Sequence, residues 1–248
     1  MAKNGIILAG GTGSRLMPLT SVVNKHLLGL NGKFIIDYPI NTLKQLGCQD
    51  VTVILGGNHY AQVAGYLGDG SRYGLNLNYV YQAEPKGIAH AISLCKRFVS
   101  DDSDFSVVLG DNVFENAPRW NNPNWKTNPR AQIMLANHPS LTRFGVASID
   151  QGKIVKIEEK PKELDPNYIN LAVSGCYLFT PRYFEYFKEL TPSARGEFEI
   201  TDIIRKYIAD DNLSFSMVNG LWSDAGTHES IAYVNHYFYQ KEHGITQI

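Results

Sequence analysis

The apolar and polar positions in the first half of the chain predict alternating strands and helices. Short runs rich in β-branched residues predict strands at 6–8, 51–55, 76–81 and 106–109, and amphipathic stretches predict helices at 35–46, 59–67 and 88–99. Strands that alternate with helices of this length pair in parallel, because each helix carries the chain back across the sheet. We therefore expect an α/β fold, Rossmann-like, with a mixed, mainly parallel sheet flanked by helices.

The second half of the chain has a different pattern. It predicts strands at 132–137 and 172–179, a β-hairpin formed by 145–150 and 153–160 around Gln151-Gly152, and helices at 181–190, 200–209 and 227–240. Residues 117–130, rich in Asn, Pro and Trp, predict an irregular excursion rather than a linker, since a strand pattern resumes directly afterwards. We expect one domain, 1–248, with a first part over residues 1–115 and a hairpin-containing second part over residues 130–230.

A glycine-rich loop follows the first predicted strand, between Leu8 and Thr20. Three glycines, Gly10, Gly11 and Gly13, let the backbone turn with its N–H groups bare, and the guanidinium of Arg15 can fork onto phosphate oxygens. These features favour a polyphosphate site, although a plain strand-ending turn would also use glycine. The loop lacks the Lys-Ser/Thr pair of a P-loop and is not a GxGxxG, so it does not indicate a dinucleotide-binding dehydrogenase.

Two aspartates are candidate metal ligands. Asp111 directly follows the strand predicted at 106–109, so it should share the carboxyl edge of the sheet with the glycine loop, and Asp224 follows another short apolar stretch. Carboxylates beside phosphate oxygens are the ligands that Mg²⁺ prefers. The alternatives are a turn aspartate for Asp111 and a helix N-cap for Asp224, although Thr227 is also a candidate for that cap.

Three cations lie in loop-like segments where binding residues concentrate. Lys25 follows the glycine loop, Lys160 ends the predicted hairpin, and Arg195 stands between Ala194 and Gly196; each could instead be a solvated surface charge. The seven histidines show no metal-binding spacing, and there is no GxSxG or Cys-His signature. The sequence therefore gives no indication of covalent nucleophilic catalysis.

The composition and net charge of the chain indicate what kind of molecule it binds. A chain of 248 residues, 44% hydrophobic and 19% charged, fits one large α/β domain. A net charge of −1 and a pI near 6.7 provide no basic field, so we expect small-molecule substrates and neither nucleic acid nor a membrane surface. Three scattered cysteines suit a reducing cytoplasm, and no apolar run predicts a signal peptide or a spanning helix.

Several motifs together resemble the sugar-1-phosphate nucleotidyltransferase family. They stand in the family's order, nearly end to end: GGTGSRLMPLT, NKHLL, Gln82 with Gly87, GDN, FGV, EEKP, AVSGCYLF, SARGEFEITD and WSDAGT. Within that family the set is most similar to the short-form glucose-1-phosphate thymidylyltransferases. The resemblance implies that glucose 1-phosphate and dTTP give dTDP-glucose and pyrophosphate with Mg²⁺, in the nucleotide-sugar biosynthesis of the cytoplasm, as in the dTDP-rhamnose pathway.

The resemblance also implies roles for individual residues. The catalytic set would be Arg15, Lys25 and Asp111, and the metal ligands Asp111 and Asp224. The nucleotide would bind at Leu8, Gly10, Gly11, Gly13, Ser14, Arg15, Gln82 and Gly87, with Gln82 and Gly87 on the pyrimidine. The sugar phosphate would bind at Asp111, Gly145, Glu159, Lys160, Val173 and Arg195.

The chain departs from the family pattern in a few places. Ser14 replaces a usual Thr, Gly29 and Phe34 replace prolines, and WSDAGT replaces LDTGT. The chain also stops soon after the helix predicted at 227–240, where many relatives continue, so a homo-oligomer is possible but the tetramer of longer members is not implied. UTP in place of dTTP and a catalytically silent nucleotide-sugar sensor are the alternatives, and the retention of Lys25, Asp111 and Asp224 argues against the sensor.

Overall fold

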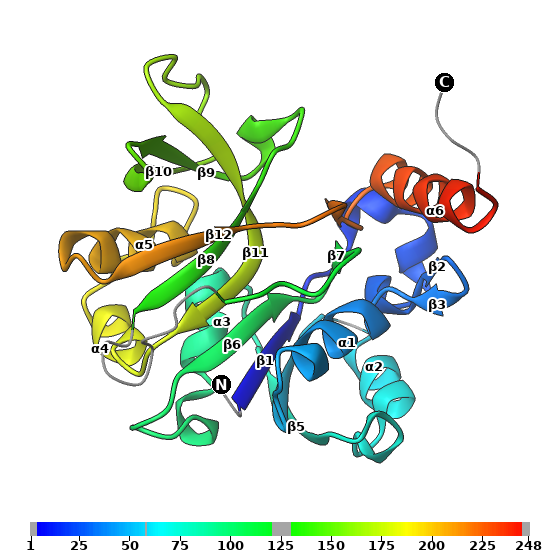
Figure 1. The fold of residues 1–248 in the computed structure, drawn as a ribbon. Coiled ribbons are helices and arrows are strands. Elements are labelled where there is room, and N and C mark those ends of the chain that lie inside the picture. Colours follow the sequence, from blue (N-terminus) through cyan, green and yellow to red (C-terminus); the bar gives the residue numbers. More distant parts are fainter. Residues whose placement is uncertain (1–3, 58, 121–129, 245–248) are drawn as a thin grey trace.

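The computed structural model describes residues 4–57, 59–120 and 130–244 (Figure 1). Its main sheet has nine strands in the order β10-β9-β11-β6-β1-β4-β5, with β8 pairing to both β11 and β12. The strands of the first half are β1 (Asn4–Ala9), β4 (Asp50–Leu55), β5 (Asn76–Tyr81) and β6 (Phe105–Leu109). Those of the second half are β8 (Ala131–Ala136), β9 (Gly145–Asp150), β10 (Lys153–Glu159), β11 (Ile169–Phe179) and β12 (Leu213–Met217).

The sheet is mixed, as predicted. It is parallel in the first half and mostly antiparallel in the second, where the hairpin was the only pairing predicted. β1 pairs in parallel with β4 and β6, and β4 with β5, because α-helical crossovers connect them. β11 runs antiparallel to β6, β8 and β9, and β9 and β10 form the predicted hairpin. β11 therefore joins the two halves into one sheet.

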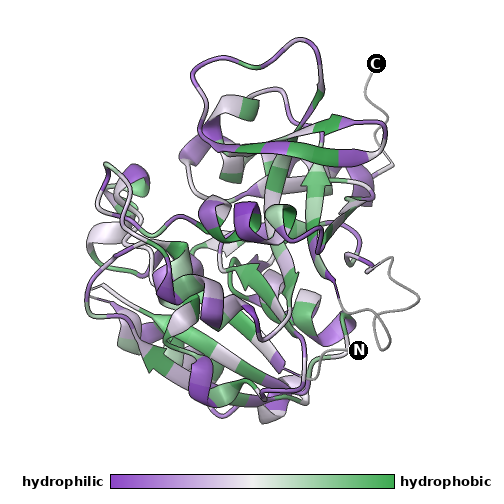
Figure 2. Cartoon of the chain, turned by 90° about the vertical axis from the view of Figure 1, so that its left-hand side faces the viewer, coloured by the Kyte–Doolittle hydropathy of each residue, from purple (hydrophilic) through white to green (hydrophobic). Residues whose placement is uncertain are grey.

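Helices cover both faces of this sheet (Figures 1 and 2). They are α1 (Asp37–Gln45), α2 (Tyr60–Leu67), α3 (Ile88–Ser93), α4 (Tyr183–Lys188) and α5 (Ile200–Ala209). The last helix, α6 (His228–Glu242), packs instead against β2 and β13, outside the main sheet. Neighbouring residues of β1 serve opposite cores: Ile6 packs with α3, α4 and α5, whereas Ile7 packs with α1 and α2. Burying each such side chain contributes about 1.5–3 kcal/mol, which explains the apolar runs that predicted the strands.

The helix predicted at 88–99 is wrong at its end. α3 stops at Ser93 and a short 3₁₀ helix, Lys96–Phe98, follows it. The N–H groups of Leu94 and Cys95 bond to carbonyls three residues back, which tightens the turn, and the chain then places Val99 in the core. The excursion predicted at 117–130 lies mostly outside the described residues, so it stays a prediction.

Two small sheets and one strand of the main sheet, β12, were not predicted. β2 (Gly29–Leu30) pairs with β3 (Lys33–Phe34), and β7 (Asn112–Phe114) pairs antiparallel with β13 (Trp222–Asp224). β12 pairs in parallel with β8. Among the described residues, no helix combines the length and the hydropathy that a membrane span needs.

Candidate active site

The glycine loop begins where β1 ends and lies against Lys25. Gly13 adopts φ 71°, and a Cβ added there would meet the Cβ of Lys25 at 2.9 Å, so glycine is required for both its conformation and its space. The loop leads into a short 3₁₀ helix, Ser14–Leu16, which carries Arg15. The predicted turn after β1 is therefore confirmed, with Lys25 packed against its glycines and Arg15 directly after it.

Lys25 belongs to a second 3₁₀ helix, Lys25–Leu27, whose start is fixed by Asn24. The Asn24 side chain accepts hydrogen bonds from the His26 backbone N–H at 3.0 Å and from His26 Nδ1 at 2.8 Å. His26 is fully buried, and burial together with the neighbouring Lys25 lowers its pKa to about 3, so its ring is neutral. This rigid turn holds Lys25 toward the end of β6.

Lys25 forms an ion pair with Asp111 at that end. Its Nζ lies 2.6 Å from Asp111 Oδ2, and the two side chains are only 12% and 16% exposed. Burial would raise the pKa of Asp111, but the adjacent Lys25 ammonium outweighs burial and holds that pKa below its usual value. Asp111 is thus a charged, shielded carboxylate, which is more than a turn residue needs.

The β7–β13 ribbon brings Asp224 beside Asp111. Asp224 lies opposite Asn112 in the ladder, and the N–H of Ala225 donates to the Asp111 carbonyl at 2.7 Å. A Cβ added to Gly226 would lie 2.8 Å from Asp224 Oδ2, 2.9 Å from Arg15 Nη2 and 3.6 Å from Asp111 Oδ2. Both predicted metal carboxylates and the loop arginine therefore converge on Gly226.

Asp224 is not the cap of the following helix. Thr227 caps α6, and its side chain and Ser230 form a reciprocal capping box. Burial and the negative charge of Asp111 raise the pKa of Asp224, while Arg143 and Arg15 oppose that rise. Its Oδ1 is buried without a hydrogen-bond partner in the described chain.

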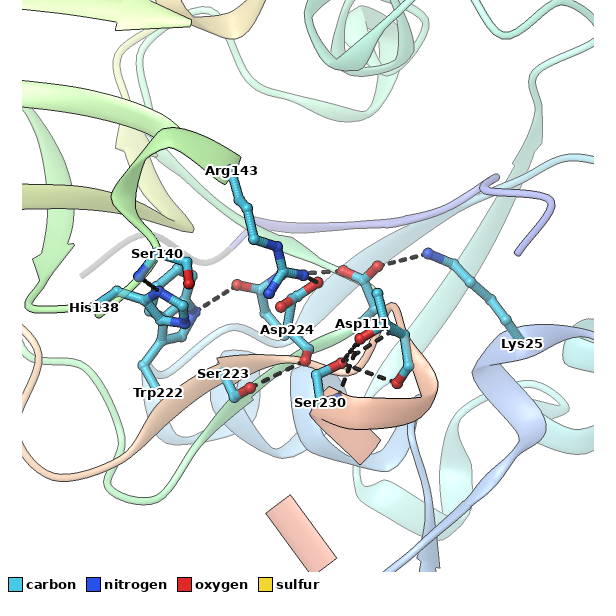
Figure 3. A network of polar contacts seen from close by, with 11 residues as sticks. Lys25, Asp111, His138, Ser140, Arg143, Trp222, Ser223, Asp224 and Ser230 are labelled. Atoms are coloured by element: carbon cyan, nitrogen blue, oxygen red, sulfur yellow. Dashed lines mark hydrogen bonds and ion pairs between the residues drawn. The ribbon is translucent and has the colours of Figure 1, made fainter. Parts of the chain in front are cut away.

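Arg143 is a site residue that the sequence analysis missed. Its Nη2 lies 3.5 Å from Asp224 Oδ2, and Figure 3 shows the two carboxylates lying between Lys25 and Arg143. Arg143 comes from the short 3₁₀ helix Leu141–Arg143, just before β9. Its only sequence signal is its position directly before the FGV motif.

Three of the predicted sugar-side residues also come together, on three neighbouring strands. Gly145 begins β9, Glu159 ends β10 and Val173 lies in β11; a Cβ on Gly145 would be 3.5 Å from Glu159 Oε2 and 3.6 Å from Val173 Cγ2. Burial raises the pKa of Glu159, and Lys160 opposes that shift. Thr201, which was not predicted, lies beside Gly145, and within the described ranges its buried Oγ1 has no hydrogen-bond partner.

Lys160 and Arg195 differ in how they are held. Lys160 Nζ lies 3.7 Å from Glu159 Oε1. Arg195 Nη2 lies 2.8 Å from Glu199 Oε2, 3.4 Å from Glu159 Oε1 and 3.9 Å from Glu197 Oε2. The hydrogen bond to Glu199 is the first cause of the raised pKa of Arg195. Arg195 is thus occupied by carboxylates, while Lys160 has one longer contact.

One cavity of about 640 Å³ joins most of these groups, although neither Lys25 nor Arg195 is among the residues that line it. Its lining includes Ser14, Arg15, Asp111, Arg143, Gly145, Glu159, Lys160, Val173, Thr201, Trp222 and Asp224. Gln82 and Gly87 do not line it, although Gly87 lies beside the lining residues Ile88 and Glu197, and Gln82 Oε1 approaches Gly10. Leu8 lies in β1 just before the loop, and its carbonyl accepts a hydrogen bond from the Gly110 N–H at 2.9 Å.

A larger cavity of about 950 Å³ opens at the opposite edge of the sheet, near Asp104, and contains none of the predicted site residues.

The residues suit a divalent ion that is completed by a ligand. No group of three or more His, Cys, Asp or Glu side chains in the described ranges could hold a metal by itself. Two neighbouring carboxylates, one with a buried oxygen lacking a partner, match the donor set of Mg²⁺, which takes its other ligands from phosphates and water.

Comparison with known proteins identifies the family of the chain. The sequence model of the nucleotidyl transferase family matches residues 4–241. The chain belongs to the nucleotidyl transferase family. The match spans both halves of the sheet, so the glycine loop and the β7–β13 ribbon lie within the nucleotidyl transferase region.

Individual relatives agree with this assignment. The chain is 38% identical over 234 residues to a low-salt glycan biosynthesis nucleotidyltransferase of Haloferax volcanii, covering 93% of this chain and 64% of that protein. It is 37% identical over 232 residues to the glucose-1-phosphate thymidylyltransferase of Neisseria meningitidis, covering 92% and 79%. A Bacillus anthracis protein provisionally named glucose-1-phosphate thymidylyltransferase, crystallised with a sucrose, superposes with a TM-score of 0.86 at 43% identity, covering 94% of each chain.

Proposed function

We propose that this nucleotidyl transferase moves the thymidylyl group of dTTP onto glucose 1-phosphate, giving dTDP-glucose and pyrophosphate. The observation that carries the proposal is the single cavity in which Arg15, both aspartates and the sugar-side strand ends meet. Such an arrangement can receive two phosphorylated molecules at once. Relatives named glucose-1-phosphate thymidylyltransferase support the choice of substrates.

The nucleotide would lie along the glycine loop, at Leu8, Gly10, Gly11, Gly13 and Ser14. Arg15 and Lys25 stand on either side of that loop, and their positive charges would offset the triphosphate. Gln82 and Gly87, at the end of β5 and the start of α3, would contact the pyrimidine. The loop follows β1 and Gln82 follows β5, and β4 is the one strand between them in the sheet.

Asp111 and Asp224 would hold Mg²⁺. When bound, the ion would supply a double positive charge that offsets the negative charge of the phosphates and of the leaving pyrophosphate. Its arrival would also relieve the repulsion between the two carboxylates that raises the pKa of Asp224. Lys25 and Arg143 keep the pair compact, because each carboxylate already contacts one cation.

The glucose 1-phosphate would occupy the other side of the cavity. Gly145 leaves room beside Glu159 and Val173, and the Glu159 carboxylate can accept hydrogen bonds from sugar hydroxyls. Lys160 and Arg195 would bind the phosphate. For Arg195 this requires the phosphate to replace Glu199 or Glu159 as its partner.

The chemical step needs positioning and charge rather than a protein nucleophile. An oxygen of the sugar phosphate attacks the α-phosphorus of dTTP in line, and the bond from that phosphorus to the bridging oxygen of pyrophosphate breaks. The attacking phosphate is already ionised at neutral pH, since its second pKa is about 6, so no general base is required. Arg15, Lys25 and the bound ion stabilise the negative charge that accumulates.

An array of substrates tests the proposal. Pyrophosphate release is measured with dTTP, UTP, dCTP, ATP and GTP, each combined with glucose 1-phosphate and its epimers. We expect the highest kcat/KM for dTTP with glucose 1-phosphate. The thymine methyl group provides only about 1–3 kcal/mol of discrimination, so the preference between dTTP and UTP has to be measured. A higher kcat/KM for UTP would identify a uridylyltransferase instead. Nucleotide binding without release in any pair would indicate a silent sensor.

A further inference from the structure

Gln82 lies against the glycine loop at the end of β5. Its backbone N–H donates to the Leu55 carbonyl at 2.8 Å, which continues the pairing of β5 with β4. Its Oε1 lies 3.3 Å from the position that a Cβ on Gly10 would take. The carboxamide oxygen therefore points over the loop where the nucleotide would lie.

The other end of this amide is engaged by α3. Gln82 Nε2 lies 3.1 Å from His90 Nδ1 and 3.5 Å from the Gly87 carbonyl oxygen. The Gly87 carbonyl can only accept, so the amide group that faces it must be the NH₂. The reversed amide would bring its oxygen against that carbonyl, which is repulsive.

His90 is in the protonation state that this arrangement needs. Burial and the neighbouring Lys86 lower its pKa below the usual value, against an opposing effect of Glu84, so the ring is neutral at pH 7. A neutral imidazole has one nitrogen that accepts, and Nδ1 can take that role toward the Gln82 NH₂. The ring is held in place by Phe198, with centroids 6.2 Å apart, and by Phe187 at 6.4 Å.

We propose that His90 is a positioning residue for base selection, which fixes the Gln82 amide with its oxygen toward the base. A glutamine side chain free to rotate can present either a donor or an acceptor, and so cannot exclude a base with an inverted edge. With its NH₂ held by His90, Gln82 presents only an acceptor. The proposal rests on the proposed function in one respect, namely that the pyrimidine lies at Gln82.

A fixed acceptor distinguishes thymine from cytosine. Thymine and uracil carry N3–H, a donor that pairs with Gln82 Oε1, and beside it O4, an acceptor. The Gly87 N–H at the start of α3 has no acceptor within the helix and can donate to that oxygen. Cytosine places an unprotonated N3 and an amino group at the same positions, so both contacts become unfavourable. Thymine and uracil present the same edge and are not separated by this device.

The test measures binding of three nucleotides that share one sugar, dTTP, dUTP and dCTP. Titration calorimetry is done with Mg²⁺ and without sugar phosphate, so the result does not depend on turnover. His90→Phe keeps the ring between Phe187 and Phe198 but removes the acceptor. His90→Gln removes the ring but offers a new acceptor. His90→Leu is a second variant without an acceptor, in case the Phe variant does not fold.

We expect wild type to bind dTTP more tightly than dCTP. His90→Phe should reduce the ratio of the dTTP and dCTP binding constants by about tenfold, the scale of one lost hydrogen bond. His90→Gln should keep this ratio within about threefold of wild type, and the ratio of the dTTP and dUTP binding constants should be the same in all variants. An unchanged dTTP to dCTP ratio in the Phe and Leu variants would overturn the proposal, as would no preference in wild type. A protein that shows these ratios but releases no pyrophosphate with glucose 1-phosphate would contradict the proposed function alone.

Discussion

Lys25 and Arg195 are both paired with carboxylates, but in opposite settings. Lys25 is nearly buried and has one partner, Asp111 at 2.6 Å. Arg195 is 42% exposed and has three carboxylates within 3.9 Å. A buried pair is costly to break because it leaves an uncompensated charge, whereas exposed pairs contribute about 0–1 kcal/mol and exchange readily.

The difference separates a permanent contact from an exchangeable one. Lys25 and Asp111 form part of the folded framework, and Arg195 is held beside the cavity by acids that an anion can replace. On the proposed function, a nucleotide would add its phosphates to a cation that stays in position. The nucleotide side of the site would then be preformed, and the sugar side would be completed by its substrate.

The largest loss of activity should come from replacing either of the two aspartates. Asp111→Asn and Asp224→Asn should each lower kcat by about a thousandfold or more, because on the proposed function each removes one of the two carboxylate charges that would hold Mg²⁺. Circular dichroism should show a folded protein for each variant. Near-normal turnover of either one in Mg²⁺ would mean that this aspartate is not a metal ligand.

Removing one cation that is proposed to bind phosphate should cause a smaller loss. The loss should affect dTTP on the nucleotide side and glucose 1-phosphate on the sugar side. Arg15→Ala should weaken dTTP binding, measured by calorimetry without sugar phosphate. Lys160→Ala and Arg195→Ala should instead lower kcat/KM for glucose 1-phosphate. Each loss should be about 1.5–3 kcal/mol, the scale of a charge-assisted hydrogen bond, and we expect Arg195 at the lower end because the Glu199 contact offsets part of its gain.

The two sides can be told apart by dTTP titration of the same three variants. Lys160→Ala and Arg195→Ala should leave dTTP affinity within about twofold of wild type, since neither residue lies at the glycine loop. Equal losses of dTTP binding in Lys160→Ala and Arg15→Ala would contradict a division into two anion sites.

Replacing Asp104, at the opposite edge of the sheet, should change the stability of the protein and leave its activity unaffected. Burial raises the pKa of Asp104 to about 6, so the folded protein holds a proton that the unfolded chain releases above its usual value of 3.8. Stability should therefore fall as pH rises from 4 to 6, and Asp104→Asn should relieve this loss. We expect urea unfolding to show a gain of about 1–3 kcal/mol at pH 8 and none at pH 4, with unchanged kcat. No gain at pH 8 would mean that the carboxyl ionises without penalty.

Regular elements of the fold could be predicted because their side chains repeat with a fixed period. The buried run of β4 and the amphipathic pattern of α5 were found with their bounds nearly right. β12 was missed although Leu213, Phe215 and Met217 alternate with serines, so its signal was present in the sequence. β7 and β13 have three residues each, which is too short for any period to appear.

The site residues that could be predicted are those that directly follow parallel strands. The glycine loop and Asp111 follow parallel strands, and their placement at one edge of the sheet follows from that topology alone. Arg143 could not be found in this way, because its partner Asp224 is distant in sequence and only the β7–β13 ribbon brings them close. The orientation of the Gln82 amide likewise depends on His90 and Gly87, which come close to it only when α3 packs on the sheet.

The β7–β13 ribbon also sets the order in which a working site can appear during synthesis. Trp222 Nε1 donates to Asn112 Oδ1 across 110 residues of chain, and the same ribbon carries Asp224 to Asp111. A growing chain that has emerged only through β12 contains every strand of the main sheet but lacks Asp224. Pairing β7 with β13 closes a long loop of chain, and the entropic cost of that closure must be offset by the ribbon's own contacts. The nascent protein can therefore form its main sheet and its glycine loop before Asp224 reaches Asp111.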